Sequence, residues 1–474
     1  MIADLKPYAE YKDAGLPWLG QVPRHWDLIP NRGLVRRRKV LVGKRHSEYR
    51  LLSLTKQGVI VRDLSTGKGK FSSDMGTSQE VRNGDLVFCL FDVPETPRTV
   101  GLSRDVGMIT GAYTVFESLG KGSPEYLELF YLAMDDRKLL SPLYSGLRNT
   151  IPAERFLGTK TPQPESHEQA AIVRFLDWAN GRLERAIRAK RKVIALLNEQ
   201  KQAIIYRAVT RGVDASVPLK PSGILWLGEI PKHWEVRRLR TLVHRIEQGV
   251  SPLAVGFLAE GDSWGVLKSG CVNRGLFRET EHKQLARAFE IDPAIVVKVG
   301  DVLISRACGS PSLVGSVGRV RSLSYRLILS DKTFRASFRD CVDVDFMVAA
   351  MNSRYYRHQV EQAISGAEGM ANNLPLSSLR DFSFAVPPKD EAAGIARFLD
   401  SETSGLQAGI TRLEREIELL REYRTRLVAD VVTGKLDVRK AATQLPEEAS
   451  PDTPENDADL SDEIEPADEE EAVV

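Results

Sequence analysis

"PRHWDL" (23–28) and "PKHWEV" (231–236) are two versions of one motif within a single chain. The wider segments "WLGQVPRHWDL" (18–28) and "WLGEIPKHWEV" (226–236) align without a gap, at an offset of 208 residues. A match of this length predicts an internal duplication.

Further matched segments follow in the same order in both copies. They are "NGDLVF" (83–88) with "VGDVLI" (299–304), "NTIPAERF" (149–156) with "NNLPLSSL" (372–379), "EQAAIVRFLD" (168–177) with "EAAGIARFLD" (391–400), and "AVTRGVD" (208–214) with "VVTGKLD" (431–437). The offset grows from 208 to 216 and then stays at 223. The insertions of the second copy therefore lie inside its globular part.

The interior of each copy is typical of a mixed α/β domain. Short β-rich runs such as "DLVFCLF" (85–91) alternate with Gly, Pro and Asn turns, and helical patches occur at 124–134 and 345–364. We expect two such domains in tandem, each of about 160 residues, which is an ordinary domain size.

The closing segment of each copy predicts one long helix. Residues 168–209 contain no proline and a single glycine, and apolar residues follow a heptad-like seam in both copies. The seam consists of Ile172, Leu176, Leu183, Val193, Leu197 and Ile204 in the first copy and Leu399, Leu406, Leu413, Leu420 and Leu427 in the second. So narrow a stripe needs a partner, so we expect the two helices to pack as an antiparallel coiled coil with pseudo-twofold symmetry. The alternative is that each helix packs on its own domain.

Composition adds a charge asymmetry. The 474-residue chain has a net charge of +2, but residues 446–474 contain 13 acidic and no basic residues, which leaves +15 on residues 1–445. Such a body attracts polyanions, and such a tail is typical of disorder. The four cysteines are scattered, so no metal site is predicted. The absence of a long apolar run or a leader-like start predicts a cytoplasmic protein that binds no membrane.

These patterns divide the chain into five predicted parts. They are a first globular domain (1–166), a first helix (167–212), a second globular domain (213–389), a second helix (390–437) and an acidic, disordered tail (438–474).

The motifs resemble the specificity (S) subunits of Type I restriction-modification systems. The resemblance rests on "YKDAGLPWLGQVPRHWDL" and "PSGILWLGEIPKHWEV", on "IPAERFLGTKTPQP" and "LPLSSLRDFSFAVPP", and on the helix starts "HEQAAIVRFLD" and "DEAAGIARFLD". It implies two target recognition domains, each reading half of a bipartite, asymmetric site in double-stranded DNA, with the helices setting the spacing between the halves. It also implies two modification (methyltransferase) subunits that bind S-adenosylmethionine and methylate adenine N6. A restriction/translocase subunit would use ATP and Mg²⁺, and this chain itself would bind no cofactor.

The residues themselves indicate no catalysis. The sequence contains neither a G-x-x-x-x-G-K-[ST] loop nor an Asn-Pro-Pro-aromatic tetrapeptide. The repeated motif supplies structural anchors instead, namely Trp18, Trp26, Trp226 and Trp234, and His25 and His233 are interpreted as structural. Two other readings stay open: an assembly scaffold whose basic surface is incidental, and a nuclease with dispersed carboxylates.

Candidate DNA contacts lie in the polar loops of the interiors, because Arg and Lys read guanine or phosphate and Asn reads adenine. They are Lys68, Lys70, Arg98, Arg148, Asn149, Lys268, Ser269, Arg306, Lys332, Asn372 and Asn373. For each of them a solvated surface or turn role is the alternative.

Overall fold

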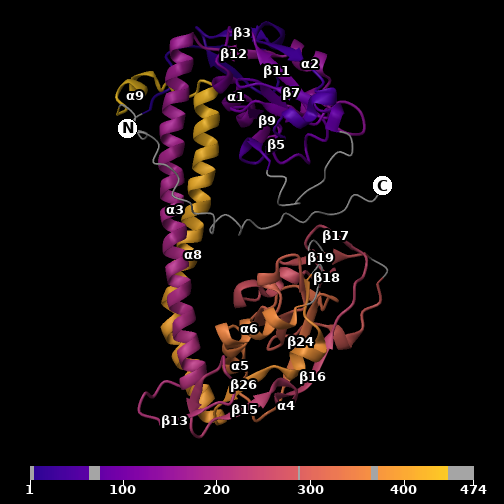
Figure 1. Cartoon of the computed structure of the whole chain (residues 1–474), viewed down its shortest axis with the longest axis vertical. Coiled ribbons are helices and arrows are strands. Elements are labelled where there is room, and N and C mark those ends of the chain that lie inside the picture. Colours follow the sequence, from indigo (N-terminus) through magenta and orange to yellow (C-terminus); the bar gives the residue numbers. More distant parts are fainter. Residues whose placement is uncertain (1–4, 63–74, 287–288, 365–371, 447–474) are drawn as a thin grey trace. The chain divides into compact units, whose positions relative to one another are not determined.

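The structure, a computed structural model, describes residues 5–62, 75–286, 289–364 and 372–446. Lys68, Lys70 and residues 447–474 of the predicted acidic tail lie outside this part. The described residues form two compact units, one of residues 5–191 with 415–446 and the other of residues 192–414. Each unit contains one globular α/β domain and half of each of two long helices (Figure 1).

The first domain is built around an antiparallel sheet in the order β4-β11-β8-β9. Its strands are β4 (Val35–Arg38), β8 (Leu86–Phe88), β9 (Val100–Leu102) and β11 (Thr114–Ser118). Helices α1 (Pro124–Asp136) and α2 (Ala153–Gly158) share its core, where the rings of Phe88 and Phe156 lie 4.8 Å apart. Four antiparallel strand pairs complete the domain: β1 (Tyr11–Asp13) with β2 (Gln21–Pro23), β3 (Asp27–Pro30) with β12 (Lys160–Gln163), β5 (Leu52–Thr55) with β6 (Gly58–Val61), and β7 (Gln79–Val81) with β10 (Gly107–Ile109).

The second domain repeats this sheet in the order β16-β24-β20-β22. The strands are β16 (Val243–Gln248), β20 (Val302–Ser305), β22 (Val317–Arg319) and β24 (Thr333–Phe338), and helices α5 (Val344–Ala350) and α6 (Arg354–Ala363) share their core. A further sheet joins β17 (Ala254–Val255), β19 (His282–Leu285), β18 (Trp264–Leu267) and β23 (Arg326–Ile328), with β18 and β23 parallel. The remaining elements are the pairs β13 (Leu219–Pro221) with β14 (Glu229–Pro231), β15 (Glu235–Arg238) with β26 (Ser383–Val386), and β21 (Ala307–Cys308) with β25 (Asn372–Asn373), and the short helices α4 (Leu239–Leu242) and α7 (Leu376–Asp381).

The register of the two sheets confirms the duplication. Phe88 on β8 pairs with Thr114 on β11, and Ile304 on β20 pairs with Phe334 on β24. Phe88 and Ile304 differ by 216, the offset that the Gly-Asp motifs predict. The alignment of sequence motifs is therefore also an alignment of strands.

The two long helices are α3 (Ser166–Arg211) and α8 (Lys389–Val432). In the first unit, the ammonium of Lys190 lies 2.6 Å from the carboxylate of Glu416. In the second unit, the ammonium of Lys201 donates to the amide oxygen of Gln407 at 2.7 Å. Arg424 also pairs with Glu184 in the first unit, and a Cβ on Gly409 would lie 3.7 Å from the Leu197 side chain in the second. Residue numbers therefore fall along α8 as they rise along α3 within each unit, which confirms the predicted antiparallel coiled coil.

One residue of the predicted seam is misplaced. Val193 is 44% exposed, whereas Ile194 is partly buried. Steps of three and four residues from Leu183 reach 187, 190, 194 and 197. Position 190 is a lysine that pairs with the opposite helix. Because this seam position is not apolar, the hydrophobic pattern is interrupted there, and the prediction named Val193 in place of Ile194.

The repeated motif anchors the first domain to the start of α3. Trp26 is fully buried, and its indole N–H donates to Oε1 of Glu168 at 3.2 Å. Nε2 of His25 lies 2.9 Å from Oε2 of the same carboxylate, and the hydroxyl of Tyr8 donates to Oε1 at 2.6 Å. Glu168 is only 1% exposed, so its buried carboxylate depends on these partners.

The second domain repeats this arrangement at the start of α8. The fully buried Trp234 donates its indole N–H to Oε1 of Glu391 at 3.0 Å, and Nε2 of His233 lies 2.6 Å from Oε2. The other two tryptophans are partly buried, and Trp226 stacks on Tyr355 with ring centroids 5.9 Å apart. The geometry gives both histidines a structural partner.

The start of the predicted disordered tail is folded. Residues Arg439–Thr443 form α9, and Val438, Ala442 and Leu445 are buried in the core of the first unit. The prediction of disorder from 438 is therefore wrong for residues 438–446, which carry apolar side chains and precede the acidic run.

Candidate nucleic-acid interface

A turn that occurs in both domains holds the strands that lead to the candidate interface. The carboxylate of Asp85 accepts a hydrogen bond from the backbone N–H of Arg82 at 2.6 Å, and that of Asp301 accepts one from Lys298 at 2.9 Å. These are the aspartates of the matched "NGD" and "VGD" segments. Each closes a turn directly before the central strand β8 or β20.

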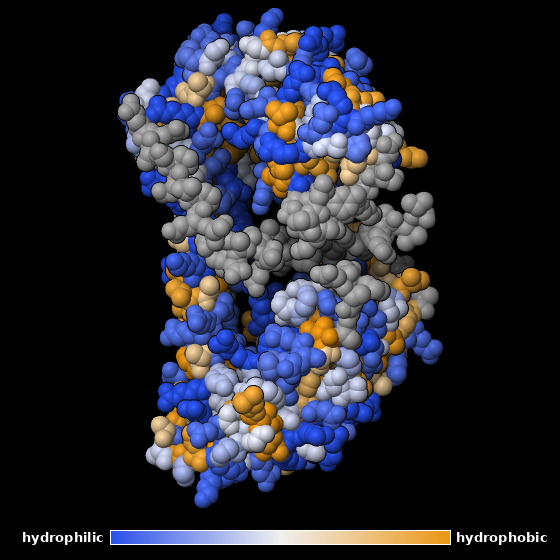
Figure 2. Space-filling view, in the orientation of Figure 1, coloured by the Kyte–Doolittle hydropathy of each residue, from blue (hydrophilic) through white to orange (hydrophobic). Residues whose placement is uncertain are grey.

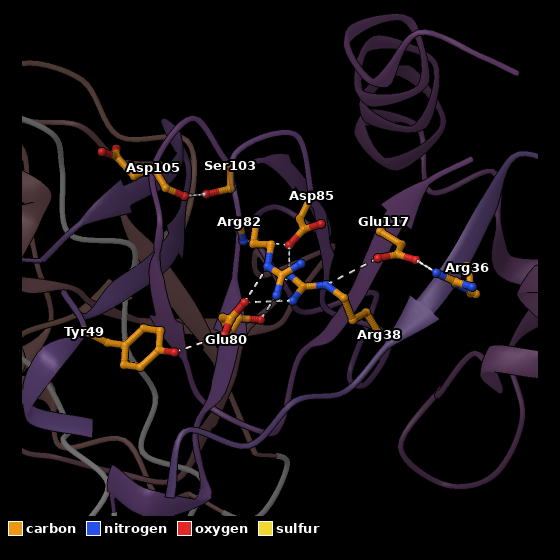
Figure 3. Close-up of polar contacts among 9 residues, drawn as sticks. All are labelled: Arg36, Arg38, Tyr49, Glu80, Arg82, Asp85, Ser103, Asp105 and Glu117. Carbon is orange, nitrogen blue, oxygen red and sulfur yellow. Dashed lines mark hydrogen bonds and ion pairs between the residues drawn. The ribbon is translucent and has the colours of Figure 1, made fainter. Parts of the chain in front are cut away.

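Each of these aspartates also pairs with a nearly buried arginine. In the first domain, Arg38 contacts Asp85 and lies 3.2 Å from Glu80 and 3.7 Å from Glu117 (Figure 3). Burial raises the pKa of the Asp85 carboxyl, and the arginine opposes this effect. In the second domain, Arg335 lies 3.2 Å from Asp301. These ion pairs lie at the start of β8 and β20, opposite the loops that follow the two strands.

Beyond the central strand, both domains make the same junction between two loops. The N–H of Ile151 donates to the carbonyl of Leu90 at 2.8 Å, and the N–H of Leu374 donates to the carbonyl of Arg306 at 2.8 Å. Leu90 and Arg306 each follow the central strand, and Ile151 and Leu374 each precede a proline. We call this the loop junction.

The loop junction of the second domain brings four candidate residues together. The N–H of Arg306 donates to the carbonyl of Lys332 at 2.8 Å, and β21 and β25 place Ala307 opposite Asn373. The side-chain amide of Asn372 donates to the carbonyl of Gly309 at 3.3 Å. The segments around Arg306, Lys332 and Asn372 therefore bring cationic and amide side chains to one surface. These are the types of group that contact phosphates and base edges.

Arg306 is held rather than free in this cluster. Its guanidinium donates to the carbonyl of Asp331 at 2.9 Å and lies 5.9 Å from the centre of the Phe334 ring. Lys332 is about half exposed, and its ammonium is 3.4 Å from the carboxylate of Asp331. Of the two, Lys332 is the more available to a ligand.

The sequence reading missed Gln248 at the same surface. Its side-chain amide donates to the carbonyl of Asp331 at 3.1 Å, and the residue is exposed at the end of β16. Glutamine can bond adenine through two groups. The available signal was its position before Gly249, where a Cβ would lie 2.0 Å from the carbonyl oxygen of Leu329, so the backbones approach closely there.

The loop junction of the first domain contains Arg148 and Asn149. Arg148 is exposed and forms an ion pair with Asp92, which lowers the pKa of that carboxyl. Asn149 adopts a positive φ of 41° in a tight turn and is partly buried. Both residues shape the hairpin that this loop forms.

The remaining candidates are Arg98, Lys268 and Ser269. The guanidinium of Arg98 is mostly buried and donates to the carbonyls of Val100 and Lys56 and to the carboxylate of Glu128, which indicates a structural role. Lys268 and Ser269 follow β18, where the ammonium of Lys268 lies 3.9 Å from Glu281.

A basic groove of about 480 Å³ lies at the start of β16 in the second domain. It is lined by Arg240, Val243, His244, Arg245, Ile246, Ser377, Arg380 and Asp381. Asp381 pairs with Arg240 at 2.7 Å. Three arginines around one aspartate make the groove suited to an anion such as a phosphate.

The described residues contain neither a candidate metal site nor a candidate membrane-spanning helix. No group of three or more His, Cys, Asp or Glu side chains within that part of the chain could hold a metal ion. None of the described helices is both long enough and apolar enough to cross a membrane.

Comparisons with known proteins bear on the fold and the motifs. No protein-family model matches the chain. The Type I restriction enzyme EcoEI specificity subunit of Escherichia coli is 29% identical over 162 residues, which cover 34% of this chain and 27% of that protein. The MjaVIII specificity subunit of Methanocaldococcus jannaschii is 26% identical over 289 residues, which cover 60% and 64%. The matches thus span less than two thirds of either relative.

A solved structure has the same fold over nearly the whole chain. It comes from a study of complex assembly and conformational transition of the type I R-M system, and it covers 88% of this chain and 99% of its own, with a TM-score of 0.55 and 15% identity. This likeness concerns the fold, whereas the two specificity subunits are similar in sequence. Through its duplicated motifs, its fold and these similarities, the chain is related to the specificity subunits of Type I restriction enzymes.

Proposed function

We propose that this chain is the DNA sequence-specificity subunit of a Type I restriction-modification complex. Each globular domain reads one half of a bipartite, asymmetric site in duplex DNA. The observation that carries the proposal is the repeated loop junction, which presents Arg306, Lys332 and Asn372 in one domain and Arg148 and Asn149 in the other. The net charge of +15 on residues 1–445 supports a polyanionic ligand.

The basic groove supports phosphate binding by the second domain. Phosphate contacts position a protein on the duplex, and base contacts supply the specificity. Arg240 and Arg380 in the groove fit the first role, and the loop junction fits the second. The two surfaces lie at opposite ends of β16, because Gln248 at the far end contacts the Asp331 loop.

We further propose that catalysis is supplied in trans. Two modification subunits bind S-adenosylmethionine and methylate adenine N6, and a restriction subunit uses ATP and Mg²⁺, while this chain binds none of these and acts in the cytoplasm. The similarity to specificity subunits supports this division, and the sequence contains no Walker-type loop. An assembly scaffold and a nuclease remain the alternatives that the experiment must exclude.

Methylated adenines should be mapped in the source genome and in a strain that lacks this gene. We expect one bipartite sequence to lose its methylation in the deletion strain, and purified chain with a modification subunit to restore it in vitro. Methylation or cleavage by the chain alone would indicate an enzyme. If the complex protects no DNA sequence from a footprinting reagent, the result would favour an assembly scaffold.

Lys332→Ala should weaken binding to specific and unrelated duplexes by a similar factor, because we assign the Lys332 ammonium to a phosphate contact, which carries no sequence information. The slope of log affinity against log salt should fall by about 0.9 for one lost phosphate contact. The measurement is a binding titration at several salt concentrations. Lys232→Ala is the matched control, since Lys232 is exposed directly after β14 and belongs neither to the loop junction nor to the lining of the basic groove. Equal slopes for Lys332→Ala and wild type would remove Lys332 from the interface.

A further inference from the structure

A small hairpin projects from the loop junction of the first domain. Ser145 and Thr150 exchange two backbone hydrogen bonds of 2.9 and 3.0 Å, and the turn between them spans 146–149. Positive φ angles at Gly146 (70°) and Asn149 (41°) close this turn. At its tip, the side chain of Leu147 is fully exposed, at 104% of its reference area.

The hairpin is fixed to the segment that follows β8. The N–H of Asp92 donates to the carbonyl of Arg148 at 2.9 Å, and the guanidinium of Arg148 bonds both oxygens of the Asp92 carboxylate, with Nε at 3.1 Å from Oδ1. The same guanidinium lies 5.7 Å from the centre of the Phe91 ring. The backbone on both sides of Leu147 is therefore held, so the leucine is presented in one place.

A single exposed leucine is ordinary on a protein surface, and Figure 2 shows hydrophobic residues scattered over the visible face. Leu147 differs because its position is fixed: the Ser145–Thr150 backbone bonds close the hairpin, and the next residue, Arg148, is paired with Asp92. The hairpin also belongs to the loop junction that we propose contacts DNA. Leu147 is the fully exposed apolar side chain of the tip. The sequence offset of 223 matches Leu147 to Met370, another large apolar residue, which lies outside the described part.

We propose that Leu147 contacts the C5-methyl group of a thymine in the half-site that the first domain reads. The thymine methyl is the apolar group that base pairs present in the major groove, so an apolar side chain there distinguishes thymine from the other bases. Arg148 is then a positioning residue that holds the tip. This inference rests on the proposed function and adds a specificity-determining residue to it.

The test replaces each thymine of that half-site in turn by deoxyuridine, which lacks only the methyl group. The protein is the full chain in complex with a modification subunit, and affinity is measured for wild type and for Leu147→Ala. We expect one position at which deoxyuridine weakens wild-type binding about fourfold, the loss of one buried methyl-sized group. At that position Leu147→Ala should already be weakened and should not respond further to deoxyuridine.

Leu225→Ala is the matched control, because Leu225 is 100% exposed in the turn between β13 and β14, which contains no residue of either loop junction. It should bind and discriminate as wild type does, and the salt slope of Leu147→Ala should equal that of wild type, since no phosphate contact is lost. Unchanged affinity of Leu147→Ala, or a loss with an unaltered deoxyuridine response, would overturn the inference. Failure of the wild-type complex to prefer any duplex would instead contradict the proposed function.

Discussion

Trp26→Ala is expected to destabilise the first unit by about 3–5 kcal/mol, the usual cost of removing a large aromatic side chain from a core. Trp26 is fully buried, and its N–H bonds the carboxylate of Glu168, which is 1% exposed. The substitution therefore creates a cavity and also removes a partner from a buried charge. Because Glu168 lies in the first turns of α3, the damage should extend to the start of that helix.

Urea unfolding with hydrogen exchange read separately in the two units measures this effect. Trp26→Phe separates the two causes, since it keeps most of the apolar volume and removes only the N–H donor. Trp18→Ala is the control, because Trp18 is only partly buried in the same core and should cost less. Equal stability of Trp26→Ala and wild type would mean that the repeated motif does not anchor the domain.

The duplication could be predicted because strict spacing survives in both sequence and register. The offset of 216 between the Gly-Asp motifs is also the offset between Phe88 and Ile304. These two residues hold equivalent positions in their sheets, where Phe88 pairs with β11 and Ile304 with β24. The helices could be predicted because a heptad pattern is local. The seam failed at Val193 because Lys190 occupies a core-facing position through an ion pair, which hydrophobicity alone does not reveal.

Long-range polar partners could not be predicted from one sequence. Glu168 and Glu391 stand in the quoted helix-start motifs, yet their partners lie 142 and 157 residues earlier in the chain. The candidate site shows the same limit. Arg306 bonds Leu374, the residue after Asn373, only because the two segments fold side by side. Arg98 proves to be an internal donor although its type and loop suggested DNA.

The partner of the repeated aspartate is the clearest case, because the two domains supply it from different strands. In the first domain, Arg38 on β4 lies opposite Val115 on β11, and in the second, Glu247 on β16 lies opposite Arg335 on β24. The arginine has thus moved to the neighbouring strand while the aspartate has stayed. An alignment of the two copies would match Arg38 with Glu247 and would miss that both domains solve one electrostatic problem.

Arg335→Met should destabilise the second unit by about 3–5 kcal/mol, the cost of breaking a nearly buried ion pair. The guanidinium is 10% exposed and bonds the carboxylate of Glu247 at 2.9 Å, that of Asp301 at 3.2 Å and the carbonyl of Val296 at 2.8 Å. Methionine fills the volume but leaves Asp301 without its cation and Glu247 with only the exposed Arg245. Urea unfolding of the second unit, followed by hydrogen exchange in β20 and β24, measures the loss.

The first domain supplies the compensating variant. The double variant Arg335→Val with Glu247→Arg gives the second domain the Val–Arg pair that Val115 and Arg38 form in the first. The new arginine on β16 can then reach Asp301 as Arg38 reaches Asp85. We expect this double variant to recover most of the stability that Arg335→Met loses, whereas Arg335→Val alone should not. A double variant no more stable than Arg335→Val would show that the two domains are not interchangeable at this position. Recovery would show that the fold requires a cation beside the repeated aspartate and is indifferent to which strand carries it.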